Sequence, residues 1–502
     1  MTCSVSVAAG ADYERAAEDL VRRAGYLLAA IVLLGCAGSA WTLLARERGG
    51  PRHRDVTLAG DVPATFYLPD AGEPPPAVVV GHGYSGDRVT MSSLSRSLAE
   101  AGYAVLAIDF AGHGASPRSS AAVDGADELA AGLDWLEDSA EVDPDRLAVL
   151  GHSMGAYAVL ELVAGDPRPS ATVVFGSSRS TPFGGREPPN LLVLAGENDS
   201  SSVHSGSRAL AERVDGARVA EIEGANHVSI LWFDDTVAET VAWLDAVFGI
   251  QRETPAELVD DRLGVALLYF LFLPVAFAAL GALAGKLGPR RSAGAPATLR
   301  TFALLAAALV VAAPVVAIVE PAGFFGAGFG DVVVYLAIAG ALICLPQLRG
   351  TRSVPPTATL TRLAAAGLGC AVAMFVLLSP LGAVLHRLVP TLQRALLAGL
   401  MTPLLGLFFV QLQASVRRGS LVRSTSASAA AHFVVLLGLT AGVVLGVFPG
   451  VVGLALPLLA GVFGLVEVFG ITAYAAGRNG VLVGVVESFW VAGLAAAVMP
   501  LP

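Results

Sequence analysis

Charged residues are scarce in this chain. Only 15% of its 502 residues are Asp, Glu, Lys or Arg, whereas 54% are hydrophobic and the mean hydropathy is +0.66. This balance excludes a single soluble globule and predicts membrane-embedded segments. Basic residues are few between residues 55 and 250, where 29 Asp and Glu against 10 Arg leave a net charge of −19. So acidic a segment argues against nucleic-acid binding.

Cysteine is also rare. The four cysteines are Cys3, Cys36, Cys344 and Cys370. The last three lie inside apolar runs, and none of the four lies between residues 55 and 250. This distribution predicts neither a disulfide framework nor a metal site with thiolate spacing. No metal or organic cofactor is implied.

Long apolar runs divide the chain into parts. Residues 24–45 form a run of about 22 mostly apolar positions, enough to cross a bilayer at about 1.5 Å per residue. A cleaved signal peptide is the rival interpretation, but its apolar core usually has only ~7–15 residues. We therefore predict a cytoplasmic N-terminus over 1–23, a transmembrane anchor over 24–45, a soluble domain over 55–250 and a membrane domain over 263–499. The membrane domain is expected to contain about eight further spans, at 263–285, 301–319, 327–346, 363–384, 395–413, 428–447, 449–475 and 480–499.

The soluble segment alternates between apolar strands and amphipathic helices. Strands are expected at 55–60, 63–69, 77–80, 103–109, 146–150, 171–176, 191–195 and 217–222, and helices at 88–102, 124–138, 154–164, 204–214 and 228–248. This alternation predicts an α/β fold with a doubly wound, mostly parallel sheet. Only about 14 residues separate the strand ending near Gly176 from the next one at Leu191. They leave no room for an inserted lid domain, and we expect an open site.

The most informative motif is Gly151-His152-Ser153-Met154-Gly155, which follows the apolar run Leu147–Leu150 and precedes a predicted helix. A strand that turns sharply into a helix at a serine is a nucleophile elbow. The serine there has a strained backbone, and a Cβ at either glycine would collide with the neighbouring strand or helix. Ser153 is therefore the predicted nucleophile.

A serine nucleophile needs a base and an acid that orients the base. Asp199, in the loop after the strand 191–195, is the predicted acid, and Glu197 in the same loop is the alternative. His227 follows the last strand and is the predicted base, because its order in the chain and its loop position both fit. The backbone N–H groups of Met154 and Tyr84 are expected to bind the oxyanion.

These motifs resemble those of the α/β-hydrolase superfamily, and the resemblance covers about 40% of the chain. His82-Gly83 and the segment Asp109–Ser116, similar to a D-x-x-G-H-G-x-S loop, add to the Ser153 motif. The closest resemblance is to lidless esterases and dienelactone-hydrolase-like members. Dienelactone hydrolases use a cysteine nucleophile, so Ser153 departs from them and their substrate is not carried over. His82, His113 and His152 are expected to support loops without transferring protons.

The loops between the predicted spans indicate the orientation in the plasma membrane. Odd-numbered loops of the membrane domain carry 11 Lys and Arg, whereas even-numbered loops carry only Arg387 and Arg394. Since cytoplasmic loops retain basic residues, the odd loops are expected inside and the soluble domain outside the cytoplasm. The basic connector 46–54 would then be external, which counts against this orientation.

Two carboxyl groups lie within predicted spans. Glu467 and Glu487 are expected at similar depth on adjacent spans, and His432 could join them. Such residues are often functional, which favours a proton-linked or polar-substrate site, whereas the alternative is a protonated pair that serves packing. Small residues in the 449–475 span are predicted to permit close helix packing: Gly450, Gly453, Gly461 and Gly464.

Three functional hypotheses follow. The first is a membrane-bound serine hydrolase that cleaves an ester or thioester of a small molecule or lipid through an acyl-enzyme, with Ser153, His227 and Asp199 as catalytic residues. The second is a transporter or channel with an accessory hydrolase or sensor domain. The third, a binding module on an inactive hydrolase fold, is disfavoured by the complete Ser/Asp/His set.

Overall fold

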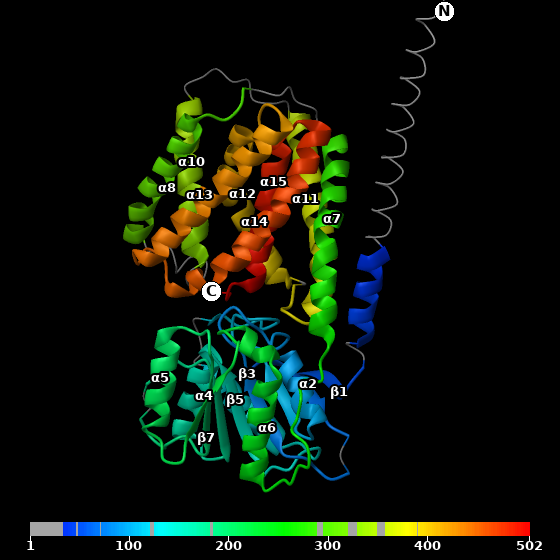
Figure 1. Cartoon of the computed structure of the whole chain (residues 1–502), viewed down its shortest axis with the longest axis vertical. Coiled ribbons are helices and arrows are strands. Elements are labelled where there is room, and N and C mark those ends of the chain that lie inside the picture. Colours follow the sequence, from blue (N-terminus) through cyan, green and yellow to red (C-terminus); the bar gives the residue numbers. More distant parts are fainter. Residues whose placement is uncertain are drawn as a thin grey trace, which may run out of the picture.

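The computed structural model describes residues 34–46, 49–70, 72–120, 125–180, 184–288, 295–319, 329–348, 357–388 and 390–501. An α/β domain and a bundle of long apolar helices are stacked along the long axis of the molecule (Figure 1). The end of α15 (Gly480–Val498) lies at the junction between them. The predicted fold class, an α/β sheet joined to a helical membrane domain, is confirmed.

The α/β domain is built on one eight-stranded sheet with the order β1-β2-β4-β3-β5-β6-β7-β8. Only the pairings of β1 with β2 and of β2 with β4 are antiparallel. The strands are β1 (Arg52–Leu58), β2 (Val62–Leu68), β3 (Ala77–Gly81), β4 (Ala104–Ile108), β5 (Leu147–His152), β6 (Ala171–Phe175), β7 (Leu191–Gly196) and β8 (Arg218–Ile222).

Helices cover both faces of this sheet. The alternation of side chains along a strand sends Val79 to one face and Val78 and Val80 to the other. Val79 belongs to the core under α3 (Gly125–Glu137) and α4 (Met154–Gly165), while its neighbours pack in the core under α2 (Ser92–Glu100) and α6 (Asp234–Phe248). Burial on both faces explains why the central strands are continuous apolar runs.

Several element boundaries differ from those expected. The helix expected at 88–102 is α2, which begins at Ser92 and ends at Glu100, and three further differences have a local cause. β1 begins three residues before the predicted strand and ends at Leu58, because Gly60 and Asp61 adopt positive φ angles of 72° and 58° in the turn to β2. The segment expected as one helix over 228–248 is divided at Phe233 into a short 3-10 helix, η2 (Ser229–Trp232), and α6. The helix expected at 204–214 is α5 (Ser201–Ala211), which begins earlier because Ser200 caps it.

The described part of the membrane domain contains eight long helices. They are α7 (Arg262–Leu287), α8 (Leu299–Val319), α10 (Phe329–Leu348), α11 (Thr357–Leu378), α12 (Leu392–Val416), α13 (Leu421–Val444), α14 (Gly450–Gly477) and α15. Among the described residues, seven helices are long and apolar enough to cross a membrane, and a shorter apolar helix covers residues 330–344 within α10. These helices make the chain a multi-pass membrane protein by length and composition.

Close helix packing uses other glycines than those predicted. A Cβ on Gly450, Gly461 or Gly464 would meet nothing within 4 Å, so the prediction for these positions is wrong. By contrast, Gly281 of α7 lies against the backbone of α14, and Gly484 of α15 lies against the backbone of α12. Composition alone does not show which face of an apolar helix meets a neighbour.

Part of the predicted anchor lies outside the described residues. Residues 34–46 are helical, and Cys36 and Leu43 pack in the same core as Phe277 of α7 and Met374 of α11. Residues 24–33 are not described, so the span 24–45 stays a prediction.

Candidate active site

The Gly-x-Ser-x-Gly motif forms a sharp turn at the carboxyl end of β5. Ser153 stands between β5 and α4 with φ 53° and ψ −109°. A Cβ on Gly155 would lie 2.5 Å from the Gly81 carbonyl oxygen, and a Cβ on Gly151 would collide with the Gly155 carbonyl. The turn therefore requires glycine at both positions, and it projects the serine from the edge of the sheet.

Three predicted side chains lie in one hydrogen-bonded line. The Ser153 hydroxyl donates to His227 Nε2 over 3.0 Å, and His227 Nδ1 donates to Asp199 Oδ2 over 2.9 Å. Asp199 Oδ1 accepts from the Ser200 backbone N–H at 2.7 Å. Burial alone would raise the pKa of Asp199, but the hydrogen bond and charge of His227 outweigh it and the pKa is lowered. An ionised Asp199 can fix the tautomer of His227 that leaves Nε2 free to accept a proton.

Glu197, the alternative acid, points elsewhere. Its Oε2 accepts from the Gly224 backbone N–H at 2.8 Å, which ties the loop after β7 to the loop that carries His227. Asp199 is the member of the pair that reaches the imidazole.

Three other histidines hold the surrounding loops. His152 Nε2 donates to the His227 carbonyl at 2.7 Å, and burial lowers the pKa of His152 to about 4. His82 Nδ1 donates to the Gly83 carbonyl at 2.8 Å while its Nε2 accepts from the Phe110 N–H at 3.1 Å. Burial also lowers the pKa values of His82 and of His113, the latter to about 3. Neutral imidazoles in these positions act as hydrogen-bonding supports.

The expected oxyanion donors flank the nucleophile. Met154 is the first residue of α4, where a backbone N–H has no partner within the helix. Tyr84 follows Gly83, and a Cβ on Gly83 would come within 2.7 Å of His152 Nδ1 and 3.3 Å of Ser153 Cβ. The glycine lets the backbone of this segment approach the serine closely. We call residues 82–87, which continue β3, the oxyanion loop.

The intramembrane carboxyl groups form a second polar cluster, which we call the membrane cluster. His432 of α13 lies between them, with Nδ1 2.9 Å from Glu467 of α14 and Nε2 2.7 Å from Glu487 of α15. Arg417 of α12 pairs with Glu467 at 2.7 Å, and Gln413 donates to Glu487 at 2.8 Å. The structure thus brings together Glu467, Glu487 and His432, as the sequence suggested, and adds Arg417 and Gln413 to the cluster.

Sequence reasoning missed a set of polar contacts between the two domains. Asp87 of the oxyanion loop meets His386 and Arg387 of the α11–α12 connection, and Arg394 of α12 binds the segment after β4. The only signal for them was that Arg387 and Arg394 are the two basic residues in the even-numbered loops.

Comparison with known proteins identifies relatives of the soluble domain. Residues 72–182 match the family described as serine aminopeptidase, S33. An uncharacterized protein of Mycobacterium tuberculosis H37Rv is 34% identical over 131 residues, which are 25% of this chain and 46% of that protein. Cutinase est2 of Thermobifida alba is 28% identical over 197 residues, covering 36% of this chain and 62% of the cutinase. The chain spans about half the length of the curated relatives it matches.

Among solved structures, an esterase of Pyrococcus furiosus aligns with 39% of this chain and 93% of its own, at 20% identity and a TM-score of 0.34. A serine hydrolase without a lid from Xanthomonas campestris aligns with 41% of this chain and 97% of its own, also at 20% identity and a TM-score of 0.34.

Proposed function

We propose, on the premise that the soluble domain of this chain is an α/β-hydrolase, that the protein is a membrane-bound serine hydrolase. Its substrate is an ester or thioester of a small molecule or lipid, and Ser153, His227 and Asp199 are its catalytic residues. The observation that carries this proposal is the continuous line of hydrogen bonds from the Ser153 hydroxyl through His227 to Asp199. The cutinase relatives are compatible with an ester substrate.

The reaction follows from the positions of these atoms. Ser153 Oγ attacks the acyl carbon while His227 Nε2 takes the hydroxyl proton, and Asp199 stabilises the imidazolium that forms. The negative oxygen of the tetrahedral intermediate accepts hydrogen bonds from the N–H groups of Met154 and Tyr84. His227 then protonates the leaving alcohol or thiol, which leaves an acyl group on Ser153. A water molecule, deprotonated by His227, attacks this acyl group; the carboxylic acid departs and the serine recovers its proton.

The direct test uses the full chain in detergent. Ser153→Ala is expected to abolish hydrolysis of p-nitrophenyl butyrate and labelling by a fluorophosphonate probe. Ser205→Ala, on the exposed side of α5, is the matched control and should behave like the wild type. Labelling that survives in Ser153→Ala but is absent in a variant of another serine would contradict the assignment.

The same proposal places the hydrolase domain outside the cytoplasm. Those basic residues of the odd-numbered loops that the structure describes lie at the helix ends remote from the α/β domain, as does Lys286 in the last turn of α7 (Figure 1). The connector that counted against this orientation is partly neutralised, since Arg46 pairs with Asp261. In intact cells, a membrane-impermeant maleimide should label Ser205→Cys and spare Arg423→Cys; the reverse pattern would refute this topology.

A second candidate function is proton-coupled transport through the membrane domain, and the membrane cluster is the observation that favours it. His432 and Glu487 are almost completely buried. Because ionisable groups within a membrane are energetically costly, they are rare there and often mark a functional site. In proteoliposomes with a pH-sensitive dye, Glu487→Gln would abolish proton movement and spare esterase activity. If the dye response of the wild type equals that of empty liposomes, the cluster serves packing only.

A further inference from the structure

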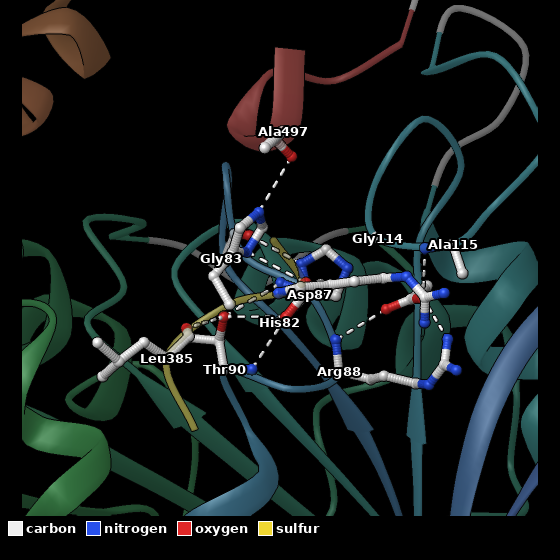
Figure 2. A network of polar contacts seen from close by, with 12 residues as sticks. His82, Gly83, Asp87, Arg88, Thr90, Gly114, Ala115, Leu385 and Ala497 are labelled. Atoms are coloured by element: carbon white, nitrogen blue, oxygen red, sulfur yellow. Dashed lines mark hydrogen bonds and ion pairs between the residues drawn. The ribbon is translucent and has the colours of Figure 1, made fainter. Parts of the chain in front are cut away.

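The oxyanion loop is attached to the membrane domain through one buried carboxylate. Asp87 is fully buried, and its Oδ1 accepts from the Thr90 backbone N–H at 3.0 Å within its own domain. Its Oδ2 faces the connection between α11 and α12, where the Arg387 backbone N–H donates over 2.7 Å and His386 Nδ1 lies 3.1 Å away (Figure 2). Asp87 therefore connects the two domains, since it binds Thr90 in its own domain and residues about 300 positions further along the chain.

His386 extends this attachment to the end of α15. Its Nε2 donates to the Ala497 carbonyl at 3.0 Å, so one ring nitrogen faces a carbonyl and the other a carboxylate (Figure 2). Both neighbours are acceptors, which favours the doubly protonated ring. Burial alone would lower the pKa of His386, but Asp87 outweighs burial and the pKa is raised.

A second buried cation holds the loop after β4. The Arg394 guanidinium is 2% exposed and donates to the carbonyls of Gly112 at 2.8 Å and Gly114 at 3.2 Å. It also donates to carbonyls at the end of α15, among them Met499 at 2.7 Å. The Leu501 N–H donates in turn to the Gly112 carbonyl at 2.7 Å, so the two domains share backbone hydrogen bonds.

These two loops are coupled to each other beside the nucleophile. Arg88, the residue after Asp87, donates its backbone N–H to Asp109 Oδ1 at 2.8 Å and pairs with the same carboxylate through its side chain. Asp109 Oδ2 accepts from the Ala115 N–H at 2.8 Å (Figure 2). Tyr84 lies only three residues before Asp87, and the intervening chain makes a tight turn closed by the Gly86 N–H and the Gly83 carbonyl at 2.9 Å. A displacement of Asp87 is therefore transmitted to the segment that lies against Ser153.

We propose that Asp87 and His386 are positioning residues through which the membrane domain sets the geometry of the oxyanion loop, so that the hydrolase is fully active only when docked on the membrane domain. This inference rests on the proposed function. An oxyanion donor acts over about 2.7–3.1 Å, and a misplacement of 1 Å typically costs about 100-fold in rate. A loosened loop lowers kcat without abolishing the nucleophile, because Ser153, His227 and Asp199 come from other segments.

The first test measures kcat and KM of Asp87→Asn and His386→Gln in the full chain. An amide at position 87 has one acceptor oxygen and no charge, so it cannot serve both the Thr90 N–H and the Arg387 N–H, and the ion pair with His386 is lost in either orientation. We expect kcat for p-nitrophenyl butyrate to fall about 10- to 100-fold with KM within about twofold, while the fluorophosphonate probe still labels Ser153 to completion. The matched control is Ser93→Ala, which removes a 2.8 Å hydrogen bond from α2 to Asp260, in the segment that leads into α7, without touching the oxyanion loop.

Wild-type kcat in folded Asp87→Asn and His386→Gln would overturn the inference while leaving the proposed function intact. Absence of labelling in the wild type would instead refute the proposed function. An equal loss of kcat in Ser93→Ala would show that the interface matters only for stability, which also overturns the role given to Asp87.

The second test does not depend on the folding of those variants. The charged groups around His386 are Asp87, Arg387 and Arg394, and the neutral rings of His82 and His113 lie close to them. Since the pKa of His386 is raised, its contact with Asp87 is complete below that pKa and is lost as the pH rises through it. Wild-type kcat is therefore expected to decline at alkaline pH, whereas His386→Arg, which keeps its charge, should hold kcat to higher pH. The same alkaline decline in both proteins would overturn the inference.

Discussion

Asp199→Asn provides the sharpest test of the catalytic assignment, because the structure determines how the new amide must lie. The oxygen at the Oδ1 position accepts a 2.7 Å hydrogen bond from the Ser200 N–H, so an NH2 group placed there would face another donor. The amide nitrogen is therefore directed to the Oδ2 position, 2.9 Å from His227 Nδ1. There it donates to the ring and leaves the hydrogen on Nε2, which can no longer take the proton of Ser153.

We expect kcat to fall by about 10⁴, the size of effect known for the wrong tautomer in a serine triad. At about 1.36 kcal/mol for each factor of ten, this corresponds to about 5 kcal/mol of lost transition-state stabilisation. Binding of substrate should change little, since the side chain of residue 199 lies behind the imidazole. The fall should therefore appear in kcat and not in KM.

The assay is steady-state hydrolysis of p-nitrophenyl butyrate by the detergent-solubilised chain, with active sites counted by fluorophosphonate titration. Glu197→Gln is the matched control, because it changes a neighbouring carboxylate that binds the Gly224 N–H and not the imidazole. Its kcat should stay within a fewfold of the wild type. If Glu197→Gln loses activity and Asp199→Asn keeps it, the acid has been assigned to the wrong residue.

Three further predictions concern stability. Gly155→Ala should destabilise the soluble domain by about 3 kcal/mol, since the new Cβ would lie 2.5 Å from the Gly81 carbonyl oxygen; a melting temperature equal to the wild type would contradict this. Arg417→Met removes one of the two cations beside Glu467 and leaves His432 to balance both carboxylates of the membrane cluster; it should cost about 3–5 kcal/mol, seen as a lower melting temperature in detergent. Burial alone would raise the pKa of Asp260, but Arg262 outweighs it and the pKa is lowered. The ion pair should therefore stabilise the fold above about pH 4 and lose this contribution as the pH falls further, which melting temperatures measured across this pH range can test.

The sequence was most informative at the nucleophile elbow, where the functional residue lies in a short motif with a distinctive local structure. The elbow at Ser153 needs glycines at fixed spacing, and both the strand before it and the helix after it have strong patterns. His227 and Asp199 could be placed because the carboxyl ends of parallel strands meet at one edge of a sheet. The sequence could not decide between Asp199 and Glu197, because the path of the loop determines which of the two carboxylates points to His227.

What the sequence did not reveal depends on contacts between distant segments. The sequence around Asp87 does not indicate that its partner is His386. Periodic patterns reveal helices and strands, but they do not reveal which distant residue pairs with a single buried acid. The predicted span beginning at 428 missed the first turns of α13, which begins at Leu421, since a polar stretch there resembles a loop. Ser424 in that stretch is fully buried in the helical bundle, so tertiary packing outweighs the polar composition.

The shared backbone hydrogen bonds between Leu501 and Gly112 have a practical consequence for enzymology. A shortened chain ending near residue 250 would expose the Gly112 and Gly114 carbonyls to water and remove the hydrogen bond of Arg387 and the ion pair of His386 from the Asp87 carboxylate. Poor turnover by such a fragment would reveal little about the intact enzyme. The detergent should therefore be varied like the substrate or the buffer, because a detergent that loosens the helical bundle would also loosen its contacts with Asp87 and Gly112.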